Sequence, residues 1–225
     1  MPNLSDFSAV IFDMDGLVLD TESSYCLAWQ KAALELGYHL TDSFCMGLSG
    51  LPGPVIDHKL RGHFGDGLPL TVFRQLSSQY WHAHVSRYGI AVRHGVADWL
   101  SYLKRQQIPY AMATNSRRAN ALHCLQLAGM ADEFTILVSR DDVAEGKPDP
   151  AIFWLAAERL QVAIAHCLVL EDSHSGIVAA NRAGAFAAYV PSVPPADSTT
   201  ISLCDVMADD LAVLLARLGV QTLVS

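Results

Sequence analysis

Basic side chains are scarce in this sequence. Lys and Arg together number 15 against 23 Asp and Glu, so the formal net charge is -8 at pH 7. A surface this acidic is repelled by the phosphates of nucleic acids and by anionic membranes. We therefore expect neither nucleic acid nor a membrane as a partner.

Several other features are missing. The five cysteines are odd in number, widely spaced and contain no CxxC pair, which argues against a disulfide framework and against a zinc site. The N-terminal residues show no basic segment ahead of an apolar one, and no run of about 18 apolar residues occurs. These absences predict a cytoplasmic protein without an export signal or a membrane span.

Apolar side chains, in contrast, are abundant. Of the 225 residues, 51% are hydrophobic and 17% are charged, a balance that supports a sizeable core and excludes global disorder. This length predicts one large domain, or one domain with a modest insertion.

Short apolar runs alternate with helical patterns over most of the chain. The apolar runs are residues 9–12, 109–113, 135–138, 166–170 and 185–190, and the helical patterns are residues 96–107, 117–127, 150–160 and 175–183. Strands that alternate with helices of about 10 to 15 residues form a parallel sheet with helices on both faces. The sequence therefore predicts an α/β core of the Rossmann-like class.

The stretch between the first two strands is helical rather than alternating. Asp20 and Thr21 are expected to cap a helix that ends at Leu36, and Thr71 is expected to cap another that ends at Tyr88. Gly-rich and Pro-rich segments should form loops: residues 47–67, around a short helix near 55–60, and residues 193–200. The predicted domains are an α/β core at residues 1–18 and 92–225 and a small α-helical domain inserted at residues 19–91.

Polar side chains follow three of the predicted strands. They are Asp13 and Asp15 after the first strand, Thr114 and Asn115 after the second, and Glu171 and Asp172 after the fourth. Ligands bind at the carboxyl ends of the strands in an open parallel sheet. Acids gathered there repel one another unless a cation lies among them, and oxygen ligands favour a hard ion. The pattern predicts a Mg²⁺ site; the alternative is that such acids only cap the following helices.

A lysine stands in a stiff segment, Gly146-Lys147-Pro148-Asp149-Pro150. The prolines restrict the backbone at the start of a helix and so fix the direction of the Lys147 side chain. A lone lysine is most often solvated. Beside several carboxylates, however, it would neutralise a nucleophilic aspartate and a phosphate oxygen together.

Four motifs, taken in order, resemble the haloacid dehalogenase superfamily. They are Asp13-Met14-Asp15-Gly16, Thr114-Asn115-Ser116, Lys147-Pro148 and Glu171-Asp172-Ser173-His174-Ser175-Gly176. The resemblance covers nearly the whole chain, and residues 17–22 and 146–153 are similar to the branch with a small helical cap. That branch contains β-phosphoglucomutase and many sugar-phosphate phosphatases.

The resemblance implies a Mg²⁺-dependent phosphatase, a phosphoric monoester hydrolase that acts on a small phosphorylated molecule. Asp13 would be the nucleophile that forms an aspartyl-phosphate, and Asp15 would protonate the leaving oxygen and then activate water. Thr114 and the backbone of Asn115 would hold the transferring phosphoryl group together with Lys147. True dehalogenases lack the second aspartate, so dehalogenation is not expected.

The metal ligands are implied by the same resemblance. Asp13, the backbone oxygen of Asp15 and Asp172 would bind Mg²⁺, and Glu171 would bind it either directly or through water. The helical insertion would act as a cap that excludes water and sets specificity. Its expected substrate contacts are Thr21, Tyr25 and Ser49.

Two other functions stay open, a phosphomutase and a non-catalytic binding protein. A degenerate binding protein would be expected to have lost at least one motif acid, and none is missing. Mutases of this branch carry an arginine in the cap loop and a histidine in the first cap helix, where this chain has Gly50 and Tyr25. This favours water as the acceptor, and the substrate would be a sugar phosphate or a nucleotide-derived phosphate. No obligate protein partner is expected.

Overall fold

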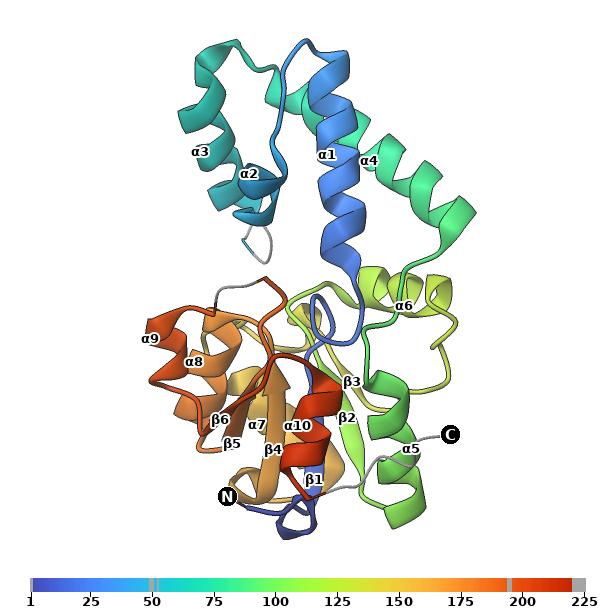
Figure 1. Cartoon of the computed structure of the whole chain (residues 1–225), viewed down its shortest axis with the longest axis vertical. Coiled ribbons are helices and arrows are strands. Elements are labelled where there is room, and N and C mark those ends of the chain that lie inside the picture. The colour runs from blue at the N-terminus through green and yellow to red at the C-terminus, as the bar shows by residue number, and fades with distance from the viewer. Residues whose placement is uncertain (1, 49–50, 52, 194–195, 220–225) are drawn as a thin grey trace. The chain divides into compact units, whose positions relative to one another are not determined.

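The computed structural model describes residues 2–48, 51, 53–193 and 196–219 (Figure 1). The chain forms two compact units, a core unit of Met1–Leu19 with Val92–Ser225 and a helical unit of Asp20–Ala91. Within the described ranges, no helix has both the length and the apolar character that a membrane crossing needs.

The core unit is built on a six-stranded sheet with the strand order β3-β2-β1-β4-β5-β6. Its strands are β1 (Ala9–Phe12), β2 (Tyr110–Ala113), β3 (Leu137–Val138), β4 (Cys167–Glu171), β5 (Phe186–Tyr189) and β6 (Val206–Met207). Every pairing in the sheet is parallel. The predicted α/β class with a parallel sheet is confirmed. β6 was not predicted, because two residues are too few to show as an apolar run.

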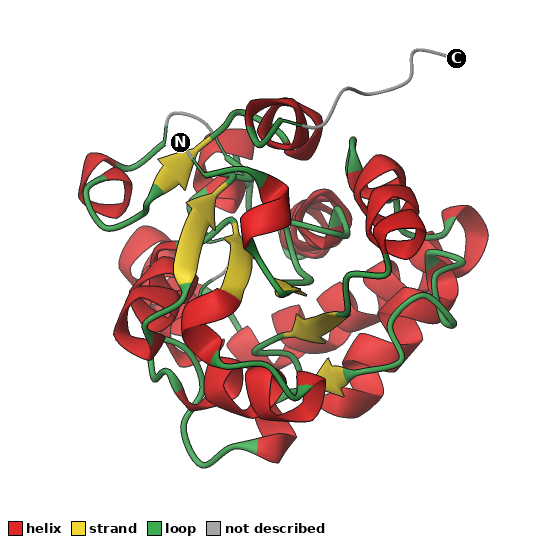
Figure 2. Cartoon of the chain, turned by 90° about the horizontal axis from the view of Figure 1, so that it is seen from below, coloured by secondary structure: helices red, strands yellow, loops and turns green. Residues whose placement is uncertain are grey.

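Helices flank the strands of this sheet (Figure 2). They are α5 (Val96–Gln106), α6 (Arg118–Leu127), α7 (Ala151–Leu160), α8 (His174–Ala183), α9 (Ser198–Ile201) and α10 (Leu211–Arg217). Alternate strand residues face opposite sides of a sheet. Ile11 therefore packs in a cluster with Phe153 of α7 and Ile177 of α8, whereas Phe12 meets the Trp99 ring of α5 edge-on at 5.9 Å between centroids.

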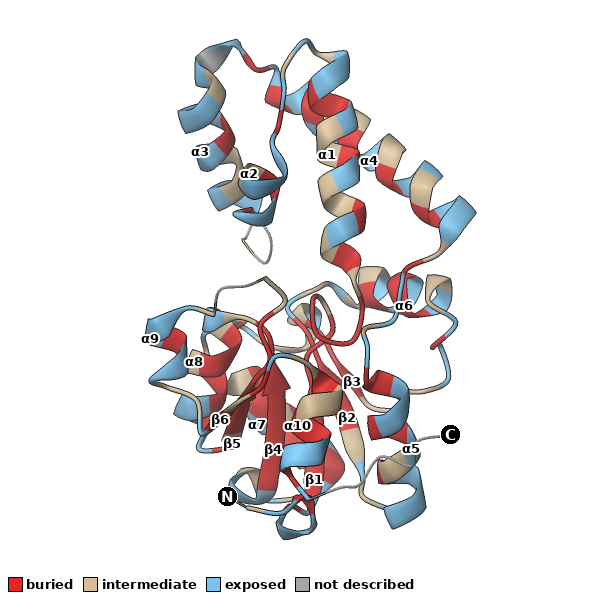
Figure 3. Cartoon of the chain, viewed as in Figure 1, coloured by how far each residue is buried: buried red, intermediate tan, exposed pale blue. Residues whose placement is uncertain are grey.

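Burial on both faces explains why the central strands are apolar without interruption. Every residue of β1 and β4 is buried, including Glu171 at the end of β4 (Figure 3). The expected fourth strand ended one residue earlier, with Glu171 after it. The structure instead makes Glu171 the last strand residue: it pairs with Tyr189 of β5, and its carbonyl accepts the Val190 backbone N–H at 2.7 Å.

The helical unit contains α1 (Thr21–Glu35), α2 (Asp42–Met46), α3 (Gly53–Phe64) and α4 (Leu70–Tyr88). Its own apolar core joins these helices through side chains such as Ala32, Leu60 and Phe73. As predicted, Asp20 caps α1: its Oδ1 accepts a hydrogen bond from the Ser23 backbone N–H at 3.2 Å.

Three local predictions are wrong. Thr71 does not cap α4, because the helix begins at Leu70 and Pro69, whose ring restricts φ, takes the capping position. The helix expected near residues 55–60 is longer, running to Phe64. Part of the loop expected at 193–200 is helical, because Asp197 caps α9 by accepting the Thr200 N–H at 2.8 Å.

Candidate active site

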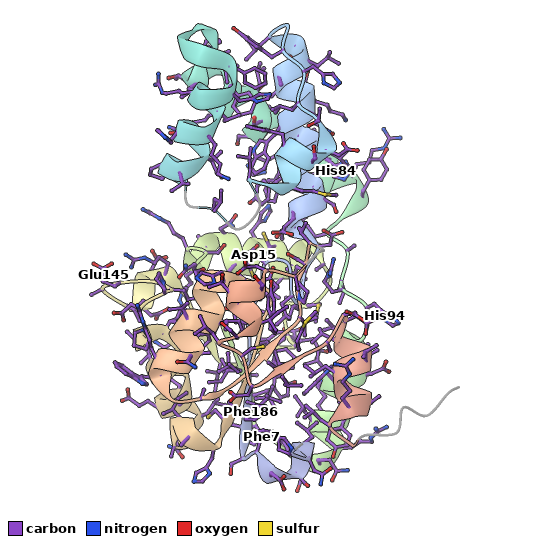
Figure 4. All side chains as sticks on the ribbon, turned by 60° about the vertical axis from the view of Figure 1, so that its left-hand side comes forward. Phe7, Asp15, His84, His94, Glu145 and Phe186 are labelled. Atoms are coloured by element: carbon purple, nitrogen blue, oxygen red, sulfur yellow. The ribbon has the colours of Figure 1, made fainter. Side chains whose placement is uncertain are left out.

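The predicted site residues of the core unit follow β1, β2 and β4 at their carboxyl ends, except for Lys147, which lies in the segment between β3 and α7. These ends are neighbours because β1 pairs with both other strands: Phe12 lies opposite Met112 in β2 and Leu170 in β4. β1 is also the strand where the sheet order changes direction, the usual position of a ligand site in an open α/β sheet. Figure 4 shows Asp15 at this end of the core unit, opposite the end that holds Phe7 and Phe186.

Three acids converge at this edge. Asp13, Glu171 and Asp172 are buried, and each offers a carboxylate oxygen within 4.8 Å of the other two. Two glycines make room for them. Gly16 has a φ of +85°, and a Cβ there would overlap Asp172 Oδ2; a Cβ on Gly176 would overlap the Glu171 carboxylate. Both glycines stand in the sequence motifs, but the motifs alone indicated no role for them.

Lys147 lies among these acids. Its Nζ donates hydrogen bonds to Asp13 Oδ1, to Glu171 Oε1 at 2.6 Å and to the Ala113 carbonyl at 2.8 Å. Its side chain is 2% exposed, so both ion pairs are buried. Buried ion pairs of this kind require good geometry, and here the Ala113 carbonyl provides a third acceptor for the three ammonium hydrogens.

Asn115 braces the lysine segment. Its Oδ1 accepts the Lys147 backbone N–H at 2.8 Å, and its Nδ2 donates to the Lys147 carbonyl at 3.1 Å. The family resemblance implied a role in phosphoryl binding only for the backbone of Asn115. Its side chain forms hydrogen bonds with both the N–H and the C=O of Lys147 and so holds the main chain there, a structural role that no motif indicated.

The site holds more negative than positive charge. Burial raises the pKa of Asp13 well above its usual range; Lys147 opposes this rise, whereas Glu171 and Asp15 add to it. Burial alone would lower the pKa of Lys147, but attraction to Asp13 and Glu171 outweighs it, so this pKa is raised. One ammonium among several carboxylates leaves an excess negative charge that suits a divalent cation.

Both oxygens of Glu171 already accept hydrogen bonds. Oε1 accepts from Lys147, and Oε2 accepts from the backbone N–H of Asp172 at 3.1 Å, the backbone N–H of Ser173 at 3.2 Å and the Ser173 hydroxyl at 3.0 Å. The carboxylate is thereby held in one orientation at the end of β4.

Asp15 lies among groups that follow β2. Its Oδ2 accepts a hydrogen bond from the Ser116 hydroxyl at 2.8 Å and a longer one from the Thr114 hydroxyl at 3.4 Å. Among the described residues, the three-acid cluster does not include Asp15. Ser116 belongs to one of the motifs quoted from the sequence, but it was not assigned to the site.

The predicted substrate contacts of the insertion lie in the helical unit. Thr21 is buried, and its carbonyl accepts the Ser24 hydroxyl at 2.6 Å. The Tyr25 ring stacks on Trp29, at 6.0 Å between centroids, and on Trp81, at 5.1 Å. Ser49 and Gly50 lie outside the described residues.

Comparisons with known proteins agree on one family. The haloacid dehalogenase-like hydrolases match residues 7–184. The phosphorylated carbohydrates phosphatase of Thermotoga maritima is 32% identical over 186 residues, which cover 78% of this chain and 81% of that protein. The β-phosphoglucomutase of Bacillus subtilis is 31% identical over 83% of this chain and 84% of its own.

A solved structure shows the same fold. It is the crystal structure of a HAD family hydrolase from Deinococcus radiodurans with bound phosphate and sodium. It superposes with a TM-score of 0.80 at 26% identity and covers 95% of this chain and 97% of its own.

Proposed function

The chain belongs to the haloacid dehalogenase-like hydrolase family, and from this premise we propose a Mg²⁺-dependent phosphatase that hydrolyses a small phosphomonoester through an aspartyl-phosphate. Its relatives include a phosphatase of phosphorylated carbohydrates, so we propose a sugar phosphate as the substrate class. The observation that carries the proposal is the buried Asp13–Lys147 pair at the end of β1, with Asp15 held two residues further on.

In the first step Asp13 attacks phosphorus. A bond forms between an Asp13 carboxylate oxygen and phosphorus while the ester P–O bond breaks. Lys147 holds Asp13 in place and supplies positive charge next to the phosphoryl oxygens, and Thr114 with the backbone N–H of Asn115 binds those oxygens. Asp15 gives its proton to the leaving oxygen.

In the second step water replaces the aspartate. Asp15, now a carboxylate, takes a proton from water as the water oxygen bonds to phosphorus and the bond from Asp13 to phosphorus breaks. Inorganic phosphate leaves, and both aspartates return to their starting states. One carboxyl group thus serves both steps, which requires that it keep its position between them.

The three-acid cluster fits a magnesium ion. Asp13, Asp172 and the backbone carbonyl of Asp15 would hold it, and Glu171, whose two oxygens already accept hydrogen bonds, would contact it through water. When bound, the ion reduces repulsion between the Asp13 carboxylate and the anionic phosphoryl group. The glycines that make room for Glu171 and Asp172 support this use of the cluster.

We propose that the helical unit is the cap that selects the substrate, with Thr21, Tyr25 and Ser49 as contacts. The second candidate is a phosphomutase, which the match to a β-phosphoglucomutase favours. Water is the acceptor that we propose. The chain has Gly50 where the mutases of this branch carry a phosphate-binding arginine, and a buried phosphate without its cation is costly.

A screen tests the proposal. Purified protein with Mg²⁺ is incubated with a panel of phosphorylated sugars, including β-glucose 1-phosphate with a trace of the bisphosphate, and both phosphate release and isomerised product are followed. We expect phosphate release on at least one sugar phosphate. Isomerisation that outpaces hydrolysis would identify a mutase instead, and neither product on any substrate would contradict the proposed function.

A further inference from the structure

We propose that Ser116 is a positioning residue that orients the Asp15 carboxyl group for its two proton transfers. The proposal rests on the proposed function, because Asp15 has this task only if phosphoryl transfer to Asp13 takes place. The contact that carries it is the hydrogen bond from the Ser116 hydroxyl to Asp15 Oδ2, at 2.8 Å. At 3.4 Å, the bond from Thr114 to the same oxygen is too long to hold the carboxyl group alone.

The backbone of Ser116 is fixed on both sides. Its N–H donates to the Thr114 hydroxyl oxygen at 3.0 Å, and its carbonyl accepts the backbone N–H of Arg140 at 3.1 Å. A serine side chain has one rotatable bond between its backbone and its oxygen. With the backbone held, the hydroxyl has few positions to adopt, and the one observed points to Asp15.

Helix capping does not account for this serine. The next helix, α6, begins at Arg118; Arg117 takes the capping position and makes no side-chain capping bond. The Arg118 N–H is instead accepted by Asp141 Oδ2 at 2.9 Å. Ser173 shows the contrast, because its hydroxyl caps α8 by accepting the Gly176 N–H at 3.1 Å. The Ser116 hydroxyl therefore serves Asp15 and not the helix.

The hydrogen bond distinguishes the two oxygens of Asp15. A serine hydroxyl has one hydrogen to donate, and while it donates to Oδ2 that oxygen acts as an acceptor. In the proposed mechanism Asp15 delivers its proton from Oδ1 to the leaving oxygen as the P–O bond breaks. Water returns a proton to Oδ1 in the second step, and Ser116 keeps its own hydrogen throughout.

The dependence on the leaving group tests this role. Phenyl phosphate and 4-nitrophenyl phosphate share a ring, but the nitrophenolate leaves readily without a proton, whereas phenolate needs one. The ratio kcat/KM reports the steps up to departure of the leaving group and not the later attack by water. We expect Ser116→Ala to lower kcat/KM about tenfold or more for phenyl phosphate and less than about threefold for 4-nitrophenyl phosphate.

Three controls sharpen the result. Ser101→Ala, at an exposed serine of α5, should leave kcat/KM unchanged for both aryl phosphates. Ser116→Thr keeps a hydroxyl and should restore the rate on phenyl phosphate. Ser116→Cys is close to serine in size but a weak donor, so it should show the same selective loss, and it replaces the alanine variant if circular dichroism shows that the latter is unfolded.

If the folded alanine and cysteine variants lose kcat/KM equally on the two aryl phosphates, the positioning role is overturned. No loss on either substrate would overturn it as well. Failure of the proposed function looks different, since the wild-type protein would then hydrolyse neither aryl phosphate nor any sugar phosphate, and Asp13→Asn would change nothing.

Discussion

The core unit and the helical unit hold their predicted site residues in different ways. In the core unit Lys147 contacts Asp13 and Glu171, which come from the ends of β1 and β4. In the helical unit Tyr25 lies between two tryptophan rings, and Thr21 bonds within its own helix. The first arrangement orients charged groups, and the second packs an aromatic ring against its neighbours. We therefore expect changes in the core unit to affect the chemical step, and changes in the helical unit to affect substrate preference.

The sharpest test of the core unit is Asp13→Asn. The amide keeps the size of the side chain but is a poor nucleophile, so kcat should fall by about a thousandfold or more. Phosphate release is the measurement, and thermal unfolding confirms the fold. Asp98→Asn, at an exposed position of α5, is the matched control and should keep full activity. Near-normal turnover of a folded Asp13→Asn protein, shown to be free of deamidation, would remove Asp13 from the nucleophile's role.

Metal removal tests the three-acid cluster. A chelator should reduce phosphate release by about a hundredfold or more, and Mg²⁺ should restore it. Ca²⁺, which takes more ligands at longer distances, should inhibit. The readout besides activity is binding of Mg²⁺ itself, by calorimetry, to wild-type protein and to Asp172→Asn. Full activity in chelator would be incompatible with the proposed use of the cluster.

Lys147→Met tests how much the buried lysine contributes to the stability of the fold. The change leaves Asp13 and Glu171 buried without their cation, and loss of one partner of a buried ion pair costs about 3 kcal/mol of unfolding free energy. Urea unfolding in chelator is the measurement. Lys31→Met, on α1 of the helical unit, should shift the midpoint little because that side chain is exposed. Unchanged stability for Lys147→Met would show that the acids do not depend on this lysine.

Tyr25→Phe probes the helical unit. The ring and its stacking on Trp29 and Trp81 are kept, and only the hydroxyl is lost. We expect KM for the preferred sugar phosphate to rise several-fold, while kcat changes by less than about threefold. A fall of kcat as large as that for Asp13→Asn would contradict the division of tasks between the two units.

Acid stability gives the smallest expected effect. Burial raises the pKa of Asp142, but hydrogen bonds from Ser139 and Arg159 outweigh it and hold the pKa well below its usual range. A lowered folded-state pKa stabilises the fold above the unfolded pKa of about 3.9, and this stability is lost as the pH falls through the folded value. Asp142→Asn should cost about 1 kcal/mol at pH 7, and less at pH 3, in urea unfolding. If Asp142→Asn costs as much unfolding free energy at pH 3 as at pH 7, the lowered pKa of Asp142 does not stabilise the fold.

The acids of the site that the sequence predicted directly follow short apolar runs. β1 and β4 are buried on both faces, so their composition identified them, and the acids beyond them were predicted to meet at one edge. Ser116 was missed because its task depends on a contact across 101 residues of sequence, which no local pattern encodes. The Thr71 cap failed because Pro69 competes for the same position, and β6 was too short to detect.

Because the Asn115 side chain binds the main chain of Lys147, the backbone conformation at position 147 does not depend on the charge of the side chain there. The Asn115 side chain binds the main-chain N–H and C=O of Lys147, groups that most residues would present in the same way. A redesign could therefore exchange the side chain at 147 for a neutral, shorter or differently charged one, while the segment keeps the same anchor. Replacing Asn115 by an apolar residue would have the opposite effect. The segment around Lys147 would lose these two hydrogen bonds, and the ammonium group would move although no charge has changed.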